Sequence, residues 1–321
     1  MKNKPLIIIA GPTGTGKSEL AIELAKQING AVISADSMQV YKNMNIGTAK
    51  ITSEQMQGIE HYMIDIMDPT DDFNIVMFKT LAKKYVEELY ERDIIPIICG
   101  GTGFYIQSLL YDIDFDESED LPQYREDLYS YANEYGADAL HEKLKDIDFE
   151  SYKSIHPNNI VRVVRALEYY RQTGQKISEH NENQKHNKSP YDFAFFVLCD
   201  DRDYMYNRID LRVDKMIEDG LVDEVLKLKK LGLGMNNISM HGLGYKEVLS
   251  YLDDEISLDE AIRIIKRDSR HYAKKQLTWF KRDNSAIFID KRNFNRDLKC
   301  ICNELIRICK DKGIIENESN V

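Results

Sequence analysis

Eight consecutive residues near the amino terminus have the types and spacing needed to bind a pyrophosphate group. Their pattern, G-x-x-x-x-G-K-[ST], is that of a phosphate-binding loop, or P-loop. The glycines let successive backbone N–H groups face one anion, Lys17 adds a point charge, and Ser18 can ligate Mg²⁺. The residues expected to hold a diphosphate are Gly11, Pro12, Thr13, Gly14, Thr15, Gly16, Lys17 and Ser18.

The flanks of this loop support that function. An apolar run, residues 6–10, precedes it, and residues 18–28 have apolar side chains at helical spacing. This is the strand–loop–helix context that phosphate binding requires, although a glycine-rich turn without a ligand is the alternative. A P-loop does not name the reaction, because kinases, ATPases and GTPases all use one.

A carboxylate is expected next to the phosphates. Asp36 ends the second predicted strand, residues 31–36, at the edge where parallel sheets bind ligands. It could bind Mg²⁺, act as a base, or cap a turn together with Ser37.

The third predicted strand, residues 94–99, lacks the acidic end that holds magnesium in many P-loop NTPases. It runs into Gly100, Gly101 and Thr102 instead, which weakens an NTPase interpretation. The glycines would let the backbone approach a ligand, and Thr102 could hydrogen-bond that ligand or cap the next helix.

The elements that position these groups indicate an α/β fold. We predict a P-loop NTPase-like parallel sheet flanked by helices, with an inserted α-helical domain. Further strands are expected at 193–199 and 286–290, and helices at 73–90, 102–110, 204–232, 259–281 and in a last segment around 296–312. The predicted divisions are 1–112 (first part of the core), 113–191 (insertion), 192–312 (second part) and 313–321 (a disordered tail).

Composition limits the class of protein. The chain has 321 residues, 43% of them hydrophobic, and a net charge of −11, so any nucleic-acid surface must be local. Five cysteines without a C-x-x-C pair indicate reduced thiols, and no apolar run is long enough for a membrane span. We therefore expect a cytoplasmic monomer with no membrane association and no obligate protein partner.

Two stretches supply local positive charge. Residues 155–190 carry six Lys or Arg against three Glu, and residues 261–282 carry eight against one Asp. Such runs are usually solvated helix faces, but they also suit phosphate contacts.

Six segments together resemble one known family. They are GPTGTGKS, DSMQVYKNMNIGTAK, GGTGFY, HPNNIVRVVRALE, GLGYKE and AKKQLTWFKRD, spread in order over about residues 5–290. This pattern resembles the tRNA dimethylallyltransferases, P-loop prenyltransferases that modify tRNA.

The resemblance implies transfer of a dimethylallyl group from dimethylallyl diphosphate to the N6 amine of adenine at tRNA position 37, just 3′ of the anticodon. The acceptors would be tRNAs that read codons beginning with U, and the products N6-dimethylallyladenosine and diphosphate. Lys17, Arg208, Arg212 and Mg²⁺ at Ser18 would then stabilise the leaving diphosphate, Asp36 would accept the amine proton, and Thr102 would lie at the reaction centre.

The resemblance also implies a set of contacts to the anticodon stem-loop, whose target base must be flipped out of its stack. These residues are Asp36, Ser37, Met38, Gln39, Thr102, Arg125, Val161, Arg162, Val163, Val164, Arg165, His241, Gly242, Leu243, Gly244, Tyr245, Lys246, Arg270, Lys274 and Lys275. Ser37 and Gln39 in particular offer hydrogen bonds to the base.

Lys275 departs from the family pattern, because an arginine is common there, and the chain ends before any zinc-finger extension of the eukaryotic kind, so a bacterial-type enzyme is expected. Two other functions remain open at this point. One is a small-molecule or nucleotide kinase with a helical lid, which would not need the basic stretches, Gln39 or Trp279. The other is a P-loop RNA-binding module in which nucleotide only switches affinity.

Overall fold

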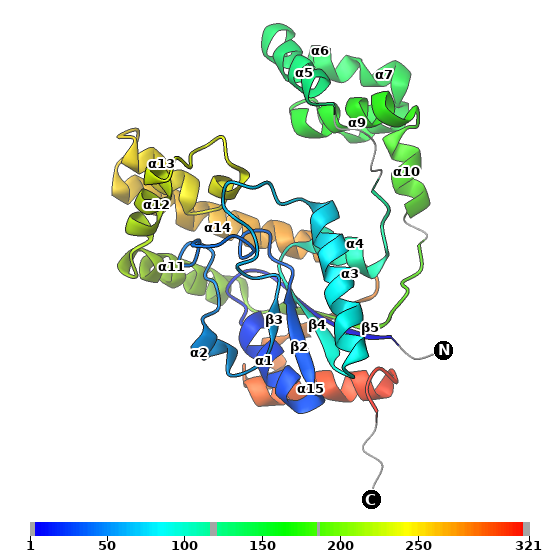
Figure 1. The fold of residues 1–321 in the computed structure, drawn as a ribbon, viewed down its shortest axis with the longest axis vertical. Coiled ribbons are helices and arrows are strands. Elements are labelled where there is room, and N and C mark those ends of the chain that lie inside the picture. The colour runs from blue at the N-terminus through cyan, green and yellow to red at the C-terminus, as the bar shows by residue number, and fades with distance from the viewer. Residues whose placement is uncertain (1–3, 116–120, 185–186, 317–321) are drawn as a thin grey trace, which may run out of the picture. The chain divides into compact units, whose positions relative to one another are not determined.

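The computed structural model describes residues 4–115, 121–184 and 187–316 (Figure 1). The chain forms two compact units: residues 1–110 with 190–321, called unit 1, and residues 111–189, called unit 2. The predicted divisions after residues 112 and 191 lie two residues from these limits. Across the described ranges, no helix has the length and apolar character needed to cross a bilayer.

Unit 1 is built on one six-stranded sheet in the order β3-β2-β4-β1-β5-β6, and every neighbouring pair is parallel. The strands are β1 (Pro5–Ala10), β2 (Gly30–Ser34), β3 (His61–Tyr62), β4 (Ile95–Gly100), β5 (Asp192–Cys199) and β6 (Ala286–Asp290). The predicted parallel α/β fold is thus confirmed. The two-residue β3 was not predicted, since so short a segment has no periodicity to detect.

One face of the sheet is covered by α1 (Lys17–Ile28) and α15 (Leu298–Asp311). Cys302 and Cys309 lie on the buried side of α15 and pack against α1 and the strands, whereas Cys300 is exposed. Ile314 is only 6% exposed and belongs to the same core. The tail predicted to begin at residue 313 therefore starts too early, and its residues 317–321 lie outside the described ranges.

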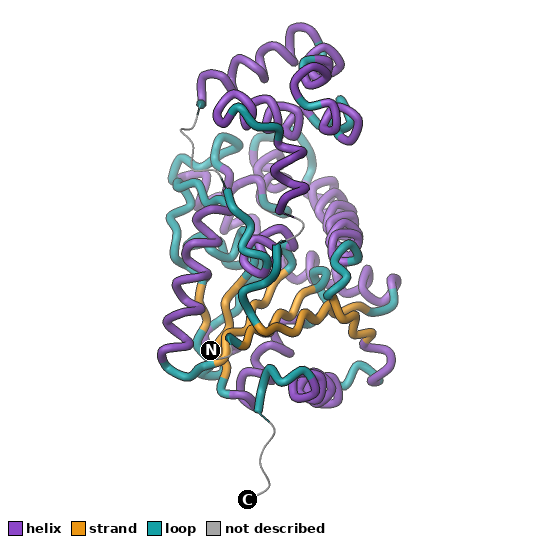
Figure 2. The backbone as a smooth tube through the Cα atoms, turned by 90° about the vertical axis from the view of Figure 1, so that its right-hand side faces the viewer, coloured by secondary structure: helices purple, strands orange, loops and turns teal. Residues whose placement is uncertain are grey.

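The other face is covered by α3 (Ile75–Glu91), α4 (Gly103–Leu110) and the carboxyl end of α14 (Leu258–Phe280). Phe78 of α3 stacks on Tyr105 of α4 with ring centroids 4.4 Å apart, and Phe195 of β5 meets Phe280 of α14 edge to face. Helices thus lie on both sides of the strands (Figure 2), which explains why the strands read as continuous apolar runs.

The region between β5 and β6 is more broken than its periodicity suggested. The predicted helix 204–232 is two helices, α11 (Arg202–Glu218) and α12 (Leu221–Lys230), separated by Gly220 at φ 99°. A short helix α13 (Tyr245–Leu252) starts within residues 241–246, the segment that the resemblance assigns to tRNA contact. The remaining pieces of unit 1 are α2 (Ser53–Met56) and two 3₁₀ turns, η1 (Ile238–His241) and η2 (Lys291–Phe294).

All regular secondary structure among the described residues of unit 2 is helical. It contains α5 (Pro122–Tyr135), α6 (Ala137–Glu142), α7 (Leu144–Ile147), α8 (Phe149–Ser154), α9 (Ile160–Thr173) and α10 (Ile177–Gln184). Its own apolar core joins Leu128 of α5, Leu140 of α6 and Leu167 of α9. Asp148 is buried and accepts hydrogen bonds from Ser151 and Ser178, which joins the starts of α8 and α10.

Candidate active site

A cavity of about 570 Å³ opens at the carboxyl ends of the central strands, within unit 1. Parallel strands end at this edge together, so residues that are distant in sequence meet here. Predicted site residues among its lining are Thr13, Lys17, Ser18, Asp36, Ser37, Met38, Gln39, Arg212, His241, Gly242, Leu243, Tyr245, Lys246 and Lys275. The other predicted residues of unit 1 do not line it: Gly11, Pro12, Gly14, Thr15, Gly16, Thr102, Arg208, Gly244, Arg270 and Lys274.

The P-loop connects β1 to α1. Gly14 and Gly16 have φ of 81° and 83°, a region that favours glycine, and Gly16 immediately precedes the first turn of α1. Lys17 Nζ donates to the carbonyl of Pro12 at 2.7 Å, and the Thr15 hydroxyl donates to the same oxygen at 2.8 Å. The lysine is therefore folded back over its own loop.

Residues far along the chain brace this loop. Arg212 Nη1 of α11 donates to Thr13 Oγ1 at 3.1 Å. Gln276 of α14 accepts from the Thr13 amide at 3.1 Å and donates to the carbonyl of Gly101 at 2.9 Å. On another side, the Lys291 ammonium donates to the carbonyl of Thr15 at 2.9 Å. Sequence reasoning did not assign Gln276 or Lys291 to the P-loop, because no local pattern connects them to it.

Two cations at the loop are desolvated. Burial lowers the pKa of Lys17 to about 8, and the neighbouring Arg212 lowers it further while Asp36 raises it. Burial also lowers the pKa of Arg212, although an arginine stays charged at any relevant pH. Cations that have lost hydration are well placed to bind an anion, which would replace the missing water.

Asp36 has one oxygen committed to its own turn. Its Oδ1 accepts from the amides of Met38 at 2.9 Å and Gln39 at 3.4 Å. Oδ2 makes no hydrogen bond to any described residue, and the side chain lines the cavity. Asp36 therefore combines the turn-capping role with an oxygen that can accept a proton or a hydrogen bond.

The amide side chain of Gln39 is already used. Its Oε1 accepts from the Ser34 hydroxyl at 3.2 Å, and its Nε2 lies 3.3 Å and 3.5 Å from the carbonyls of Thr48 and Ala49. A hydrogen bond from this side chain to a base would need one of these contacts to be exchanged, and it stays a prediction. In this structure the side chain fastens a loop to the end of β2.

Thr102 contacts a tyrosine that sequence reasoning missed. The hydroxyl of Tyr272, on α14, is in hydrogen-bond contact with the side chains of Thr102 and Gln276. Burial, followed by the charge of Asp36, raises the pKa of Tyr272 to about 12, so this hydroxyl keeps its proton at neutral pH. Tyr272 also lines the cavity. Its hydroxyl connects Gln276, which braces the P-loop, with Thr102, which is predicted to lie at the reaction centre.

The glycines after β4 serve the protein's own packing. A Cβ on Gly100 would lie 2.2 Å from the carbonyl oxygen of Ala35, and one on Gly101 would lie 2.1 Å from Gln276 Nε2. They were expected to admit a ligand. The structure shows instead that they admit the neighbouring strand end and α14.

The basic stretch on α14 is partly neutralised. Four of its eight cations have acidic partners, as in the pair of Arg270 with Asp210 at 2.5 Å and of Lys266 with Asp214 at 2.5 Å, both across to α11. Arg270, predicted to contact tRNA, is held by Asp210 through both carboxylate oxygens. Lys274 and Lys275 are exposed and form no ion pair with a described residue.

The predicted tRNA residues of unit 2 fall into two groups. Val163 and Val164 are 0% and 2% exposed and belong to the helical core, so their side chains cannot form a contact surface. Val161, Arg162 and Arg165 are exposed on the same helix. Arg125 and Arg165 both pair with the buried carboxylate of Glu168, at 2.7 Å and 3.5 Å.

The segment 241–246 is only partly a surface loop. Tyr245 is 0% exposed as a whole residue, and its hydroxyl donates to Glu224 at 2.6 Å. His241 is exposed, and Leu243 and Lys246 are half-buried at the cavity. A tRNA contact from this segment would thus involve these three side chains and not that of Tyr245.

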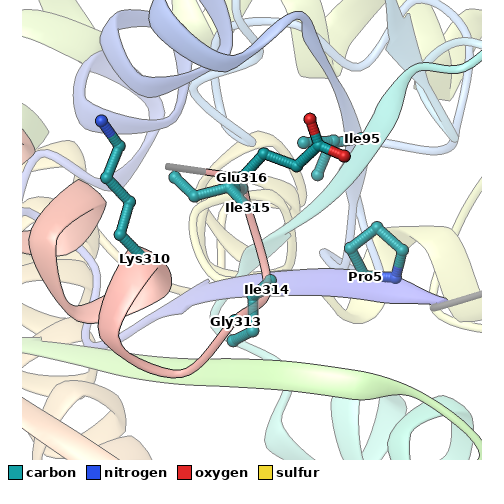
Figure 3. A pocket seen from close by; sticks show the side chains of 7 residues that line it. All are labelled: Pro5, Ile95, Lys310, Gly313, Ile314, Ile315 and Glu316. Carbon is teal, nitrogen blue, oxygen red and sulfur yellow. The ribbon is translucent and has the colours of Figure 1, made fainter. Parts of the chain in front are cut away.

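A second cavity, of about 390 Å³, lies at the opposite edge of the sheet, where β1 and β4 begin (Figure 3). It is lined by Pro5, Ile95 and the segment after α15, with Lys310 and Glu316 as its charged groups. This lining holds no phosphate-binding loop and no predicted site residue, so we look for the chemistry at the carboxyl edge.

Comparisons with known proteins point to one family. The sequence model described as "IPP transferase" matches residues 39–283. A protein named tRNA dimethylallyltransferase from Lachnoclostridium phytofermentans is 52% identical over 313 residues, covering 98% of this chain and all of that protein.

Solved structures agree. A full-length tRNA isopentenylpyrophosphate transferase from Bacillus halodurans is 40% identical, with a TM-score of 0.73 over 97% of this chain and 98% of that one. A eukaryotic dimethylallyltransferase described as acting on tRNA is 30% identical, with a TM-score of 0.83 over 98% of this chain and 81% of that one.

Proposed function

Because this chain belongs to the IPP transferase family and is a tRNA dimethylallyltransferase, we propose that its carboxyl-edge cavity joins dimethylallyl diphosphate to the N6 amine of adenine 37 in tRNA. The observation that carries this assignment is the meeting of Lys17 and Arg212 with Asp36 in one cavity. The two cations can stabilise the negative charge of the leaving diphosphate, and the carboxylate can accept a proton from the acceptor amine. The comparisons do not favour the kinase alternative, and β4 ends in Gly100 instead of an acid.

The P-loop side would hold the diphosphate. The charge that develops on it as the allylic C–O bond breaks would be stabilised by Lys17, Arg212 and the loop amides. Arg208 lies behind the loop near Gly14, outside the cavity lining, so it would act on the diphosphate at longer range.

Magnesium fits the residues present. No cluster of three His, Cys, Asp or Glu that could hold a metal exists among the described residues. The Ser18 hydroxyl is a hard oxygen donor in the cavity, however, and the Ser or Thr hydroxyl of a P-loop commonly holds Mg²⁺ together with substrate phosphates and water. Bound there by Ser18, Mg²⁺ would neutralise charge on the diphosphate.

The acceptor side would deprotonate the amine. The bond from N6 to the allylic carbon forms, the carbon–oxygen bond breaks with its electron pair leaving on the diphosphate, and the N6 proton passes to Asp36. The adenine amine is a weak nucleophile, so its orientation by Thr102, Ser37 and Met38 should contribute as much as basicity.

The tRNA would be bound by exposed side chains of both units. On unit 1 the exposed ones are Lys274, Lys275 and His241, and on unit 2 they are Val161, Arg162 and Arg165. The half-buried Lys246 and Arg125 would add to them. Arg270 would contribute only by exchanging Asp210 for a phosphate. Because tRNA is the substrate, we place the enzyme in the cytoplasm. No step of the proposed reaction requires a protein partner.

The direct test is transfer of radiolabel from dimethylallyl diphosphate to unmodified tRNA in the presence of Mg²⁺. Label should enter the tRNA, should be absent when adenine 37 is replaced, and should be absent without Mg²⁺. Unlabelled tRNA, with phosphate released from ATP instead, would contradict the proposal and support a kinase.

The lowered pKa of Lys17 predicts a pH dependence. The lysine is a cation below about pH 8 and neutral above it. The path from free enzyme and donor to the transition state needs the cation, so kcat/KM for dimethylallyl diphosphate should be level below pH 8 and fall about tenfold per pH unit above it. The bound diphosphate raises the pKa of Lys17, so the fall in kcat should begin at a higher pH.

The measurement is an initial-rate series from pH 6.5 to 10 at saturating tRNA. In Lys17→Arg, whose guanidinium stays charged, the fall near pH 8 should disappear even if the absolute rate is lower. A wild-type kcat/KM that stays level between pH 8 and 9.5 would show that the charge of Lys17 does not govern donor capture.

A further inference from the structure

A buried carboxylate on α12 holds the loop that forms one wall of the cavity. Glu224 is 9% exposed, and its Oε2 accepts from the amides of Asn45 and Ile46, each at 2.9 Å. Its Oε1 accepts from the amides of Ile46 at 3.1 Å and Gly47 at 3.2 Å. Three consecutive N–H groups thus converge on one anion, an arrangement that usually binds phosphate.

The carboxylate is satisfied without a cation. The Tyr245 hydroxyl donates a further hydrogen bond to Glu224 Oε1 at 2.6 Å. Burial and the adjacent carboxylate raise the pKa of Tyr245, which keeps that hydroxyl protonated as a donor. Glu224 forms no ion pair with any described residue. Its charge is therefore balanced by this one loop and one tyrosine, and hydrogen bonds to a charged acceptor are the strong ones.

Packing fixes the same loop from the side. A Cβ on Gly47 would lie 2.5 Å from the ring of Tyr245, so only glycine lets the loop lie flat on the tyrosine. Gly47, Thr48 and Ala49 then form part of the cavity lining. The hydroxyl and the ring of Tyr245 both serve to seat this wall.

A continuous set of hydrogen bonds leads from the loop to the proposed base. The carbonyls of Thr48 and Ala49 accept from the side chain of Gln39. The backbone amide of Gln39 donates to Asp36 Oδ1. Each step is a hydrogen bond between neighbouring groups, and the series runs from the loop held by α12 to the carboxyl end of β2.

We propose that Glu224 is a positioning residue for prenyl transfer: it seats residues 45–49 as the acceptor-side wall and, through Gln39, fixes the orientation of Asp36. This inference rests on the proposed role of Asp36 as the base. Glu224 itself does not line the cavity, so it acts through the loop and touches neither substrate.

The expected effect is on turnover and not on donor capture. Glu224→Gln keeps the size of the side chain but presents an amide N–H to the loop amides, which repels them. A displacement of the base by about 1 Å can cost on the order of 10²-fold in rate. We expect kcat to fall between about tenfold and 10²-fold, while the affinity for dimethylallyl diphosphate, measured on the full-length protein, changes less than threefold.

A matched pair of tyrosines separates positioning from general stability. Tyr245→Phe and Tyr90→Phe each remove one hydroxyl that donates a hydrogen bond, but Tyr90 donates to the carbonyl of Pro5 at the opposite edge of the sheet. Tyr245→Phe should lower kcat in the same direction as Glu224→Gln. Tyr90→Phe should leave kcat within twofold of wild type, even if its melting temperature falls as much.

Hydrogen–deuterium exchange supplies a readout that does not depend on turnover. The amides of residues 45–47 should exchange faster in Glu224→Gln than in wild type, with α1 and α3 unchanged. A Glu224→Gln enzyme with wild-type kcat, or with a kcat loss that Tyr90→Phe reproduces, would overturn the proposal. Wild-type enzyme that transfers no label at all would contradict the proposed function, whereas unchanged exchange at residues 45–47 would contradict only the role of Glu224.

Discussion

Replacing Asp36 with asparagine is expected to lower kcat for dimethylallyl transfer about 10²–10⁴-fold, the range that a positioned general base contributes. The amine proton would have no acceptor as the new bond to N6 forms. Donor affinity should change little, because the diphosphate is held by the P-loop side of the cavity. Single-turnover transfer with enzyme in excess over labelled tRNA measures this directly.

Asparagine is the informative change because Asp36 does two things at once. Its Oδ1 accepts from the amides of Met38 and Gln39, and an asparagine carbonyl can retain those bonds. Asp36→Ala loses the bonds as well, so it should be at least as slow and should also weaken tRNA binding. If Asp36→Asn stays within threefold of wild type, Asp36 is a turn cap and the base must be sought elsewhere.

Much of the fold could be predicted from local pattern. The strands near residues 6–10, 94–99 and 193–199 are apolar throughout because helices cover both faces of a parallel sheet. The P-loop could likewise be identified from the fixed positions of its glycines and Lys17. Periodicity failed where the chain is short or bent, as at β3 and at Gly220 between α11 and α12.

The site was less predictable because side chains have partners far away in sequence. The sequence indicates Arg270 as a tRNA contact, but in the structure Arg270 is paired with Asp210, which lies sixty residues earlier. The sequence indicates Gln39 as a base contact, but it does not reveal the side-chain hydrogen bonds of Gln39 with Ser34 and Thr48. The sequence indicates Gly101 as a ligand-facing glycine, but in the structure Gln276 fills the space beside it.

Other residues gave no signal at all. Tyr272 and Glu224 occupy ordinary positions in amphipathic helices, where tyrosine and glutamate are common. Their importance comes from the cavity and the loop that they face, which only the packing of α12 and α14 reveals. Burial of a glutamate among amides is a structural fact that sequence spacing does not encode.

Replacing Lys17 with methionine is expected to lower kcat/KM for dimethylallyl diphosphate about 10²–10³-fold, the loss typical of removing one preorganised group that stabilises developing charge. Methionine keeps much of the length and volume of the side chain, so the effect isolates the charge. The measurement is the initial rate as a function of donor at saturating tRNA. Lys26→Met, an exposed position on the same helix, is the matched control and should stay within twofold of wild type.

How the loss divides between kcat and KM identifies what the Lys17 charge does. If kcat and kcat/KM fall equally, the lysine acts only as the diphosphate leaves, because ground-state binding would be untouched. If KM rises at constant kcat, Lys17 binds donor and transition state alike and the catalytic charge must lie with Arg212 and the loop amides. Since Lys17 is folded onto the Pro12 carbonyl at 2.7 Å, it must turn to meet the diphosphate, and we expect the larger share of the loss in kcat. An unchanged kcat/KM would remove Lys17 from the mechanism.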